Sequence, residues 1–469
     1  MVFVLRQLQE KCREQNKGLY ITFVDLTKAF DTVSRQGMWL ILERLGCPPK
    51  FLNTIIQLHE GQQGQVKLNS ESSEPFPITN GVKQGCVLAP TLFSIYFSMV
   101  LNQAMGGLDN KDAVYIRYRP DGNLFDLRRL KARTKTTDKI IRDLLFADDA
   151  ALVAHSESAL QQITTCFAEA ARLFGLEVSL KKTEVLHQPA PRETPRSPHI
   201  FIGEAELRSV TQFTYLGCII TPDAKIDREV DNRLAKASRA FGRLYKRVWS
   251  NKHLRKDTKS KVYRAVVLTT LLYGSESWVL YRRHLKLLER FHQRCLRTIL
   301  EIKWSDHITN VEVLERSHLT SIETMILKSQ LRWAGHVSRM KDHRLPRVAL
   351  FGELSTGSRD QGGPKRRYKD TLKKALNSCN IDHKKWTSIA ADRDAWRHTI
   401  HEAAATLELS HRNHLREKRQ RRKDREGITV DPVQTHLCDR CGRTCLSRIG
   451  LYSHQRSCNG RGQHYHRRP

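Results

Sequence analysis

The sequence predicts an α+β fold, followed by a longer helical part and a small terminal domain. Residues 1 to about 220 alternate short apolar segments of strand length with amphipathic helices, as in layered sheet-and-helix folds. From about Ile226 to Leu409 the apolar residues recur with mostly helical spacing. A run of basic residues and a cluster of Cys and His residues then complete the chain.

The first half contains one clear strand and one clear helix. Residues 19–26, LYITFVDL, predict a buried strand that runs into a turn. A helix opens at Ser156 or Ser158 and ends at Gly175. Its apolar face consists of Leu160, Ile163, Phe167, Ala170 and Phe174. The prolines of QPAPRETPRSP then interrupt regular structure, and FTYLGCII reads as a short strand-like segment.

Helices of the second half combine apolar stripes with many basic residues. In residues 231–249 the stripe is Leu234, Phe241, Leu244 and Val248, and Arg233, Lys236, Arg239, Arg243 and Lys246 fall elsewhere around the helix. A later helix repeats the pattern with Leu285, Leu288, Phe291, Cys295 and Ile299. Any one basic face is compatible with a solvated surface, but their number favours contact with phosphates. The basic, Gly-rich RDQGGPKRRYK lacks phosphate-loop spacing, so we assign it no nucleotide site.

The charge balance points to a nucleic-acid partner. The 469 residues include 80 Lys and Arg against 49 Asp and Glu, a formal net charge of +31, which suits neutralisation of a polyphosphate. Most of the 11 cysteines are scattered singly, as reduced core residues are. Neither a signal peptide nor an apolar run of bilayer length is apparent in the sequence. We therefore expect an intracellular protein, nuclear and/or cytoplasmic and not secreted, with no membrane partner.

Two acidic motifs carry the candidate chemistry. FVDLTKAFD contains Asp25 and Asp31, and LLFADDAALVA contains Asp148 and Asp149. The second motif reads as a hairpin that holds two adjacent carboxylates at its tip. Oxygen ligands of this kind suit Mg²⁺ (or Mn²⁺), and a carboxylate at a strand end beside such a pair is what two-metal phosphoryl transfer requires. Each motif alone has a simpler explanation, because an Asp after a strand often caps a helix and an Asp pair often forms a solvated turn.

The order of the motifs decides between these explanations. NGVKQGCVLAPTLF lies between the two acidic motifs, and LFGLEVSLKKTEVL and FTYLG follow them. This series resembles the palm of a non-LTR (LINE-type) retrotransposon reverse transcriptase, whose five palm motifs would run from Phe23 to Gly217. The later segments YGSESW, RWAGHVSRM and GGPKRRYKD resemble the same elements.

The resemblance implies roles for individual residues. Asp25 and Asp148 match the ligands of two catalytic Mg²⁺ ions, and Asp149 matches the third acidic residue. Lys182 matches the residue that protonates the pyrophosphate leaving group, although without the family it would read as an exposed lysine. Phe30 matches the steric gate that rejects a 2′-hydroxyl. Gln84 and Gly85 match the loop that packs against the incoming nucleotide. Phe213, Leu216 and Gly217 match the grip on the primer end.

The domain order follows from the same resemblance. We expect a right-hand polymerase palm at 1–220, a thumb-like helical domain at 221–305, a helical carboxy-terminal region at 306–410, a basic linker at 411–430 and a C2HC zinc finger at 431–469. Related complete polymerases carry a fingers domain upstream of the first palm motif. Only 24 residues precede Asp25, enough for one amphipathic helix. We therefore expect a palm lacking most of the fingers, from the carboxy-terminal part of a longer ORF2-like polyprotein.

The tail carries an independent metal signal. Cys438, Cys441, His454 and Cys458 have the spacing C-x2-C-x12-H-x3-C of a ββα finger that binds Zn²⁺. Cys445 is left over for packing or as a spare thiol. His464 and His466 are less suitable substitute ligands, and chance spacing in a basic tail is the simpler alternative.

Two function classes follow from the sequence. The first is an RNA-directed DNA polymerase with an RNA template, a DNA primer, an RNA–DNA hybrid and dNTPs as partners; protein partners remain unknown. The alternative is a catalytically inactive nucleic-acid-binding remnant that keeps its carboxylates without a complete nucleotide pocket. Maturase and telomerase assignments explain the LINE-like thumb and the terminal finger less well.

Overall fold

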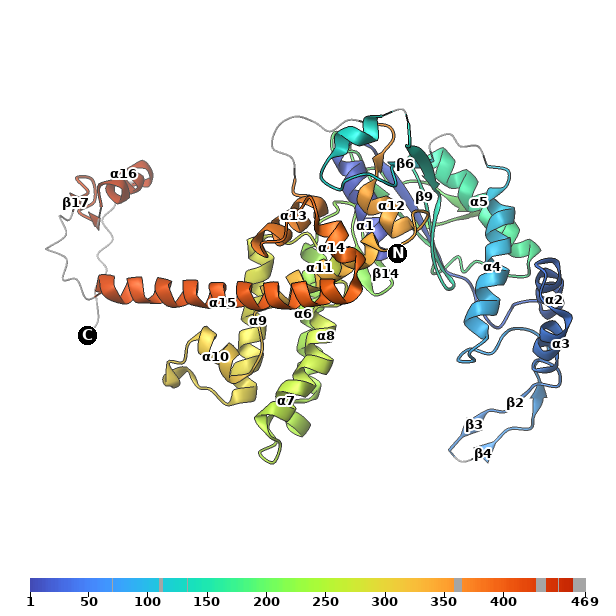
Figure 1. Ribbon diagram of the computed structural model, residues 1–469, viewed down its shortest axis with the longest axis horizontal. Helices are drawn as coiled ribbons and strands as arrows, with labels where there is room; N and C mark the ends of the chain where they lie inside the picture. Colours follow the sequence, from blue (N-terminus) through green and yellow to red (C-terminus); the bar gives the residue numbers. More distant parts are fainter. Residues whose placement is uncertain are drawn as a thin grey trace. The chain divides into compact units, whose positions relative to one another are not determined.

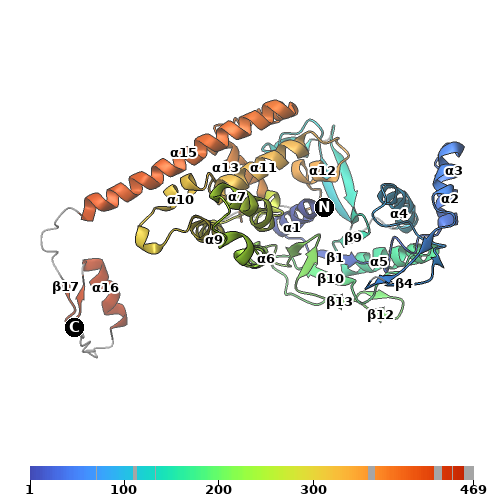
Figure 2. The same cartoon turned by 90° about the horizontal axis from the view of Figure 1, so that it is seen from below.

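A five-stranded sheet with β1 in its middle organises the first half of the chain (Figures 1 and 2). The computed structural model describes residues 1–69, 71–108, 113–132, 134–357, 365–426, 436–445 and 447–458. In the order of the sheet the strands are β13 (Arg208–Ser209), β10 (Glu184–Gln188), β1 (Leu19–Val24), β9 (Asp149–Ala154) and β8 (Asp143–Phe146). Strand β1 pairs antiparallel with both β9 and β10. The expected α+β class is confirmed.

Both faces of β1 are covered, which explains its almost continuous apolar sequence. Leu19, Ile21 and Phe23 point into one core, and Tyr20 and Val24 point into another. The polar exception is Thr22, whose hydroxyl lies 3.2 Å from that of Thr164 and so remains satisfied although buried. The buried strand predicted at LYITFV is therefore confirmed.

Helices α4 (Ala89–Met105) and α5 (Glu157–Leu173) cover one face of the sheet. Ser156 caps α5, because its hydroxyl accepts a hydrogen bond from the N–H of Ala159 at 3.3 Å. The helix ends before Gly175, which has a φ of 71°. Leu160, Ile163, Phe167 and Ala170 are buried and Phe174 is half-buried, so the predicted helix and its apolar face are confirmed.

The other face is covered by α1 (Val2–Glu14) together with helices from the far end of the chain. The late elements in this unit are α11 (Ile322–Ser338), α12 (Leu345–Phe351), β16 (Glu353–Leu354), α13 (Tyr368–Ser378), α14 (Trp386–Ala391) and the first part of α15 (Arg393–Glu426). Strand β16 pairs with β6 (Val114–Tyr118), which also pairs with β7 (Thr137–Ile141). The carboxy-terminal region thus shares one core with the amino-terminal sheet.

Gly335, in the RWAGHVSRM segment of α11, shows how closely these late helices pack. A Cβ at this position would lie 2.0 Å from Nε1 of Trp396, which belongs to α15. The indole N–H donates to the carbonyl of Leu331 at 3.1 Å. Glycine is therefore required by a close helix crossing, not by a ligand.

A third core is built from elements that come after the sheet strands and before the late helices in the sequence. It joins buried residues of α6, η3, α9 and α10, among them Val230, Tyr263, Leu288 and Val313. Its elements are α6 (Asp227–Arg243), η2 (Tyr245–Trp249), α7 (Lys256–Val262), η3 (Tyr263–Leu268), α8 (Thr269–Leu271), η4 (Ser275–Ser277), α9 (Arg282–Leu300), η5 (Trp304–Asp306) and α10 (Asn310–Arg316). The predicted apolar stripes of α6 and α9 face this core.

Short peripheral elements complete the first unit. They are α2 (Arg35–Arg44), α3 (Pro49–Gln57), β2 (Gln63–Gly64), β3 (Lys67–Leu68), β4 (Glu71–Ser72), β5 (Phe76–Pro77), η1 (Leu127–Lys131), β11 (Phe201–Ile202), β12 (Ala205–Glu206), β14 (Phe213–Tyr215) and β15 (Cys218–Ile220). The segment after Gln188 has no regular structure until β11, as its prolines predict. FTYLGCII forms the β14–β15 hairpin, which confirms its strand-like character.

One basic residue of α6 does not lie on the charged surface that the sequence predicts. Arg233 is buried, and its Nε lies 2.7 Å from a carboxylate oxygen of the fully buried Glu229. The other oxygen of Glu229 accepts from the N–H of Ile219 at 2.6 Å. This pair therefore anchors α6 to β15 and is removed from contact with nucleic acid.

The chain divides into two compact units, Met1–Glu408 and Leu409–Pro469. The finer boundaries expected inside the first unit stay predictions. In the second unit, residues 411–426 of the expected linker continue α15 as an exposed helix, one of the two forms that its composition allows. The tail adds β17 (His436–Leu437), β18 (Thr444–Cys445) and α16 (Arg448–Ser457). Within the described ranges, we find no helix with the length and apolar character needed to cross a bilayer.

Glu353 ties α1 to the late helices through two buried lysines. Its carboxylate lies 3.3 Å from Nζ of Lys11 and 2.6 Å from Nζ of Lys369, and both lysines are buried. Burial acts to raise the pKa of Glu353, but the two ammonium groups outweigh it and lower the pKa to about 2. The ionised carboxylate is therefore part of the folded state.

We predict that Glu353→Gln lowers the free energy of unfolding by about 3–5 kcal/mol near neutral pH, because two ammonium groups stay buried without their counter-charge. Since the folded pKa lies below the ordinary 4.5, the wild-type advantage is complete above about pH 4.5 and disappears as the pH falls towards 2. Urea unfolding of both proteins from pH 6 downwards measures this. Glu204→Gln, at an exposed position, is the matched control. A difference that stays constant with pH would contradict the assignment.

Candidate active site

Asp25 follows directly after β1, and the segment 179–183 holds it from the other side. Its N–H donates to the hydroxyl of Thr183 at 3.3 Å, and its carbonyl accepts from the N–H of Ser179 at 2.8 Å. Its Oδ1 lies 3.2 Å from Nζ of Lys182. The fold thus brings two predicted site residues, 157 positions apart, into direct contact.

Asp148 and Asp149 lie at the tip of the predicted hairpin. Strands β8 and β9 pair as far as Phe146 opposite Asp149, so that Ala147 and Asp148 form the turn. In the neighbouring pair of strands, Val24 of β1 lies opposite Ala150 of β9. Asp25 therefore ends its strand beside Asp149.

The charges of the three aspartates act on one another. Burial raises the pKa of Asp149, and the carboxylates of Asp148 and Asp25 raise it further. Lys182 offsets part of this negative charge at Asp25. The site therefore favours an additional cation.

The donor set fits a divalent metal ion such as Mg²⁺. All three side chains offer carboxylate oxygens, the ligands that this ion prefers, and their half-buried positions leave room for water. Among the described residues, the group whose ligand atoms all lie within 4.8 Å of one another is the Cys and His cluster of the tail.

The residues predicted to contact the nucleotide lie between β1 and α4 in the sequence. Phe30 is half-buried and stacks on Phe93 of α4, with ring centroids 4.4 Å apart. Its carbonyl accepts from the N–H of Val82 at 2.8 Å, two residues before the exposed Gln84 and Gly85. The loop that contains Gln84 and Gly85 is thus tied to the backbone of Phe30.

Arg35 was not identified from the sequence, although it holds this loop. Its guanidinium donates to the carbonyl of Gly81 at 3.0 Å, to the carbonyl of His59 at 2.6 Å and to Oε1 of Gln62 at 2.8 Å. Gly81 has a φ of 82°, and a Cβ there would meet the backbone of Asp31 at 2.6 Å. A lone arginine at the start of a helix carries no sequence signal for such a role.

The predicted primer-grip residues form the β14–β15 turn. Leu216 and Gly217 both have positive φ values, 47° and 76°, as in a two-residue hairpin turn. Phe213 stacks on Phe23 of β1 at 4.0 Å, and the hydroxyl of Tyr215 donates to the carbonyl of Leu144 in β8 at 3.0 Å. The hairpin is therefore connected to β1, which Asp25 follows, and to β8, the first strand of the hairpin that carries Asp148 and Asp149.

Tyr273 and Arg233 support this turn from the helical part. The Tyr273 hydroxyl donates to the carbonyl of Leu216 at 3.1 Å, and Arg233 donates to the carbonyl of Gly217. The Arg233 guanidinium also lies 4.6 Å from the centre of the Tyr273 ring. Tyr273 lies in the YGSESW segment, which the sequence singles out without assigning it a role.

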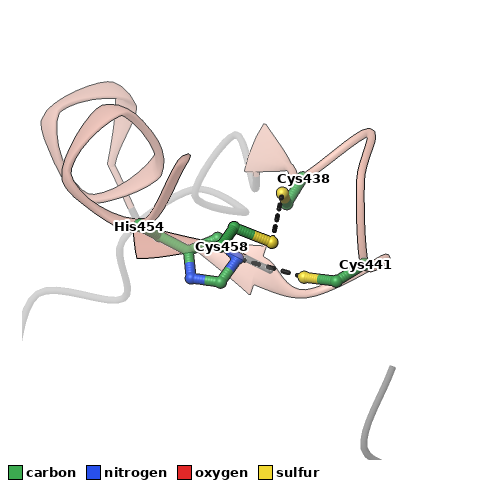
Figure 3. A group of neighbouring side chains, drawn as sticks. All are labelled: Cys438, Cys441, His454 and Cys458. Carbon is green, nitrogen blue, oxygen red and sulfur yellow. Dashed lines mark hydrogen bonds between the residues drawn. The ribbon is translucent and has the colours of Figure 1, made fainter. Parts of the chain in front are cut away.

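The four predicted zinc ligands come together in the second unit (Figure 3). Sγ of Cys441 lies 3.0 Å from Nε2 of His454, and Sγ of Cys438 lies 3.9 Å from Sγ of Cys458. Strands β17 and β18 carry the first two cysteines on their connection, and α16 carries the histidine. Sulfur and imidazole donors in this ββα arrangement fit tetrahedral Zn²⁺. Cys445 lies in β18, outside the group, and His464 and His466 lie outside the described residues.

Comparisons with known proteins show what the first half of the chain is similar to. Residues 3–220 match the family model of reverse transcriptase (RNA-dependent DNA polymerase). The chain is 24% identical over 269 residues to a putative uncharacterized transposon-derived protein of Caenorhabditis elegans, covering 55% of this chain and 94% of that protein. It is 25% identical over 296 residues to the RNA-directed DNA polymerase from mobile element jockey of Drosophila funebris, covering 62% of this chain and 29% of that polymerase.

Among solved structures, a telomerase from Candida tropicalis in complex with a fragment of telomeric RNA matches with a TM-score of 0.34 at 12% identity. That match covers 74% of this chain and 50% of the telomerase chain. The chain spans less than a third of the length of the jockey polymerase that it matches.

We predict that Lys182→Met tightens metal binding at the aspartates. Because Lys182 contacts Asp25 at 3.2 Å, a metal ion must compete with its ammonium group. An exposed ion pair of this kind is worth about 0.2–1 kcal/mol, so Mn²⁺ affinity should rise by at most about fivefold. Electron paramagnetic resonance of free Mn²⁺ measures this without any turnover.

Lys181→Met, which removes the same charge from the adjacent exposed position, is the matched control for this change. Weaker Mn²⁺ binding by the Lys182 variant would show that Lys182 supports the metal site and does not compete with it.

Proposed function

We propose that residues 3–220 are a reverse transcriptase domain of the non-LTR retrotransposon type and that the chain is an RNA-directed DNA polymerase. The observation that supports this best is the position of Asp25 at the end of β1, beside the hairpin that carries Asp148 and Asp149. Three carboxylates at one sheet edge suit the two-metal transfer of a nucleotide to a primer end.

In this proposal, Asp25 and Asp148 hold the metal ions, and Asp149 is the third acidic residue. Mg²⁺ (or Mn²⁺), when bound, stabilises the charge that develops on the attacking and leaving oxygens. Lys182 leaves its contact with Asp25 and donates a proton to the departing pyrophosphate. A lysine beside the carboxylates suits this role because its ammonium group is already within the site.

The remaining site residues select and hold the substrates. Phe30 forms the floor under the sugar and rejects a 2′-hydroxyl, and its stacking on Phe93 keeps the ring in place. Gln84 and Gly85 contact the incoming dNTP and the template. The turn of Leu216 and Gly217, with Phe213, holds the primer end, and its links to β1 and β8 support that role.

We assign residues 1–220 to the palm, 221–305 to a thumb that follows the RNA–DNA hybrid, and 431–469 to a zinc finger that adds nucleic-acid contact. Regions 306–410 and 411–430 are assigned as a helical carboxy-terminal region and a basic linker. The net charge of +31 favours backbone contact with the RNA template and the DNA primer. From such partners we propose that the chain acts inside the cell, in the nucleus and/or the cytoplasm.

We predict that Asp148→Asn reduces extension of a DNA primer on an RNA template by at least about 100-fold. This is the scale on which the loss of one preorganised electrostatic contact acts. The fold should stay intact, because Asp148 lies in the turn and is only half-buried. Primer extension and thermal unfolding of the same preparation measure both effects.

Asp231→Asn, an exposed position in α6, is the matched control for that experiment. Extension that survives Asp148→Asn would place the metal site elsewhere. Salt-dependent binding of RNA and hybrids, with no extension by the wild-type chain, would instead favour the nucleic-acid-binding remnant.

For the tail, we predict one Zn²⁺ per chain, lost in Cys441→Ser and retained in Cys445→Ser. Only Cys441 belongs to the group of converging ligand atoms, and three ligands hold a structural zinc far less tightly than four. Metal analysis of the purified chains measures this. Equal zinc loss in both variants would show that the ligand set is wrong.

A further inference from the structure

A cavity of about 260 Å³ lies in the first unit and contains none of the aspartates discussed above. Residues of α1, the end of β15, the start of α6, the start of α9 and the segment before α13 line it. Its basic lining residues are Arg6, Arg13, Lys225, Arg283, Lys365 and Arg366, and its acidic lining residues are Glu10 and Asp227. Cations therefore outnumber carboxylates in the walls.

Three of the arginines are held by neutral acceptors. Arg6 donates through Nη1 to the hydroxyl of Ser277 at 3.0 Å, while its Nη2 is buried without a hydrogen-bond partner. Arg13 donates to the carbonyl of Ala224 at 3.2 Å, and Arg366 donates to the carbonyl of Leu280 at 3.1 Å. Carbonyl and hydroxyl groups position these guanidinium groups without neutralising them.

The carboxylates around the cavity balance only part of this charge. Asp223, next to the lining, lies 3.3 Å from Nζ of Lys225. Asp227 is shared between Arg283 at 2.8 Å and His284 at 3.0 Å. Burial raises the pKa of Glu10 to about 7, although Lys11 acts in the opposite direction, so that Glu10 is only partly ionised at neutral pH. The lining thus keeps an excess of positive charge.

Lys365 shows the strain that this excess produces. Its pKa is lowered, first by burial and then by repulsion from Arg13 and Lys225, although Asp223 acts in the opposite direction. Like charges that three separate segments bring together are costly unless an anion lies between them. Lys365 and Arg366 belong to the Gly-rich basic segment to which the sequence assigns no nucleotide site; the fold supplies the other basic residues around them.

We propose that this cavity binds a phosphate-bearing anion, about the size of pyrophosphate. Guanidinium groups offer paired N–H donors that match phosphate oxygens, and those of Arg13 and Arg366 line the cavity and are only half-buried. A liquid water occupies about 30 Å³, so the cavity has room for a diphosphate group but not for a folded macromolecule. The phosphate comes either from a free anion or from a nucleic-acid strand.

The test is calorimetric titration of the full chain with inorganic pyrophosphate in metal-free buffer, which avoids any contribution from the aspartates. Arg13→Gln combined with Lys365→Gln should weaken binding at least about tenfold, since two of the converging charges are lost. The matched control is Lys50→Gln combined with Lys384→Gln, which removes two charges at positions outside the cavity lining. Lys365→Gln alone, at an exposed side chain, tests the site if the double variant does not fold.

Equal affinity of the cavity variants and the control, or no pyrophosphate binding by the wild-type chain, would overturn the proposal. Competition then identifies the source. Displacement of pyrophosphate by a short 5′-phosphorylated DNA, but not by its 5′-hydroxyl form, supports a strand-end phosphate. Displacement by neither supports a free anion. Polymerisation is not required, so this result and the primer-extension result are independent.

Discussion

The position of β1 determines where every other part of the site lies. This strand is hydrogen-bonded along both edges and packed on both faces, so its end cannot move without opening two cores. Asp25 is the next residue after β1. Pairing with β1 also fixes the position of the β8–β9 hairpin, because Ala150 of β9 lies opposite Val24. The spacing of the carboxylates is therefore a property of the sheet interior, where packing is least tolerant of change.

The net charge of the chain and the charge at the sheet edge have opposite signs. The chain carries a net charge of +31, yet the sheet edge gathers three carboxylates whose charges raise the pKa of Asp149 after burial has done so. Lys182 is an exposed basic side chain that contacts Asp25 and so brings positive charge to this acidic edge of the sheet. A cationic chain suits a polyanionic partner, and a locally negative site suits a metal ion.

The late helices are as important for the sheet as the helices next to it in sequence. Their packing on α1 closes one face of the sheet, and Glu353 with the buried Lys11 and Lys369 joins the two ends of the first unit. The same packing brings Lys365 and Arg366 against α1, where they complete the basic cavity. The region at 306–410 therefore contributes directly to the core of the amino-terminal sheet.

From the sequence alone, local patterns determined β1, the acidic hairpin, α5 with its Ser156 cap, the stripes of α6 and α9, and the ββα tail, because periodicity and caps depend on neighbouring residues. The family resemblance of the ordered motifs also singled out Asp25, Asp148 and Lys182 as candidate site residues, although not their distances. Tertiary structure alone decided that Arg233 is buried against Glu229, that Arg35 holds the Gly81 backbone, and that six basic residues meet at one cavity. Those contacts join residues far apart in the chain, and their energy depends on burial and on partners that no local pattern specifies.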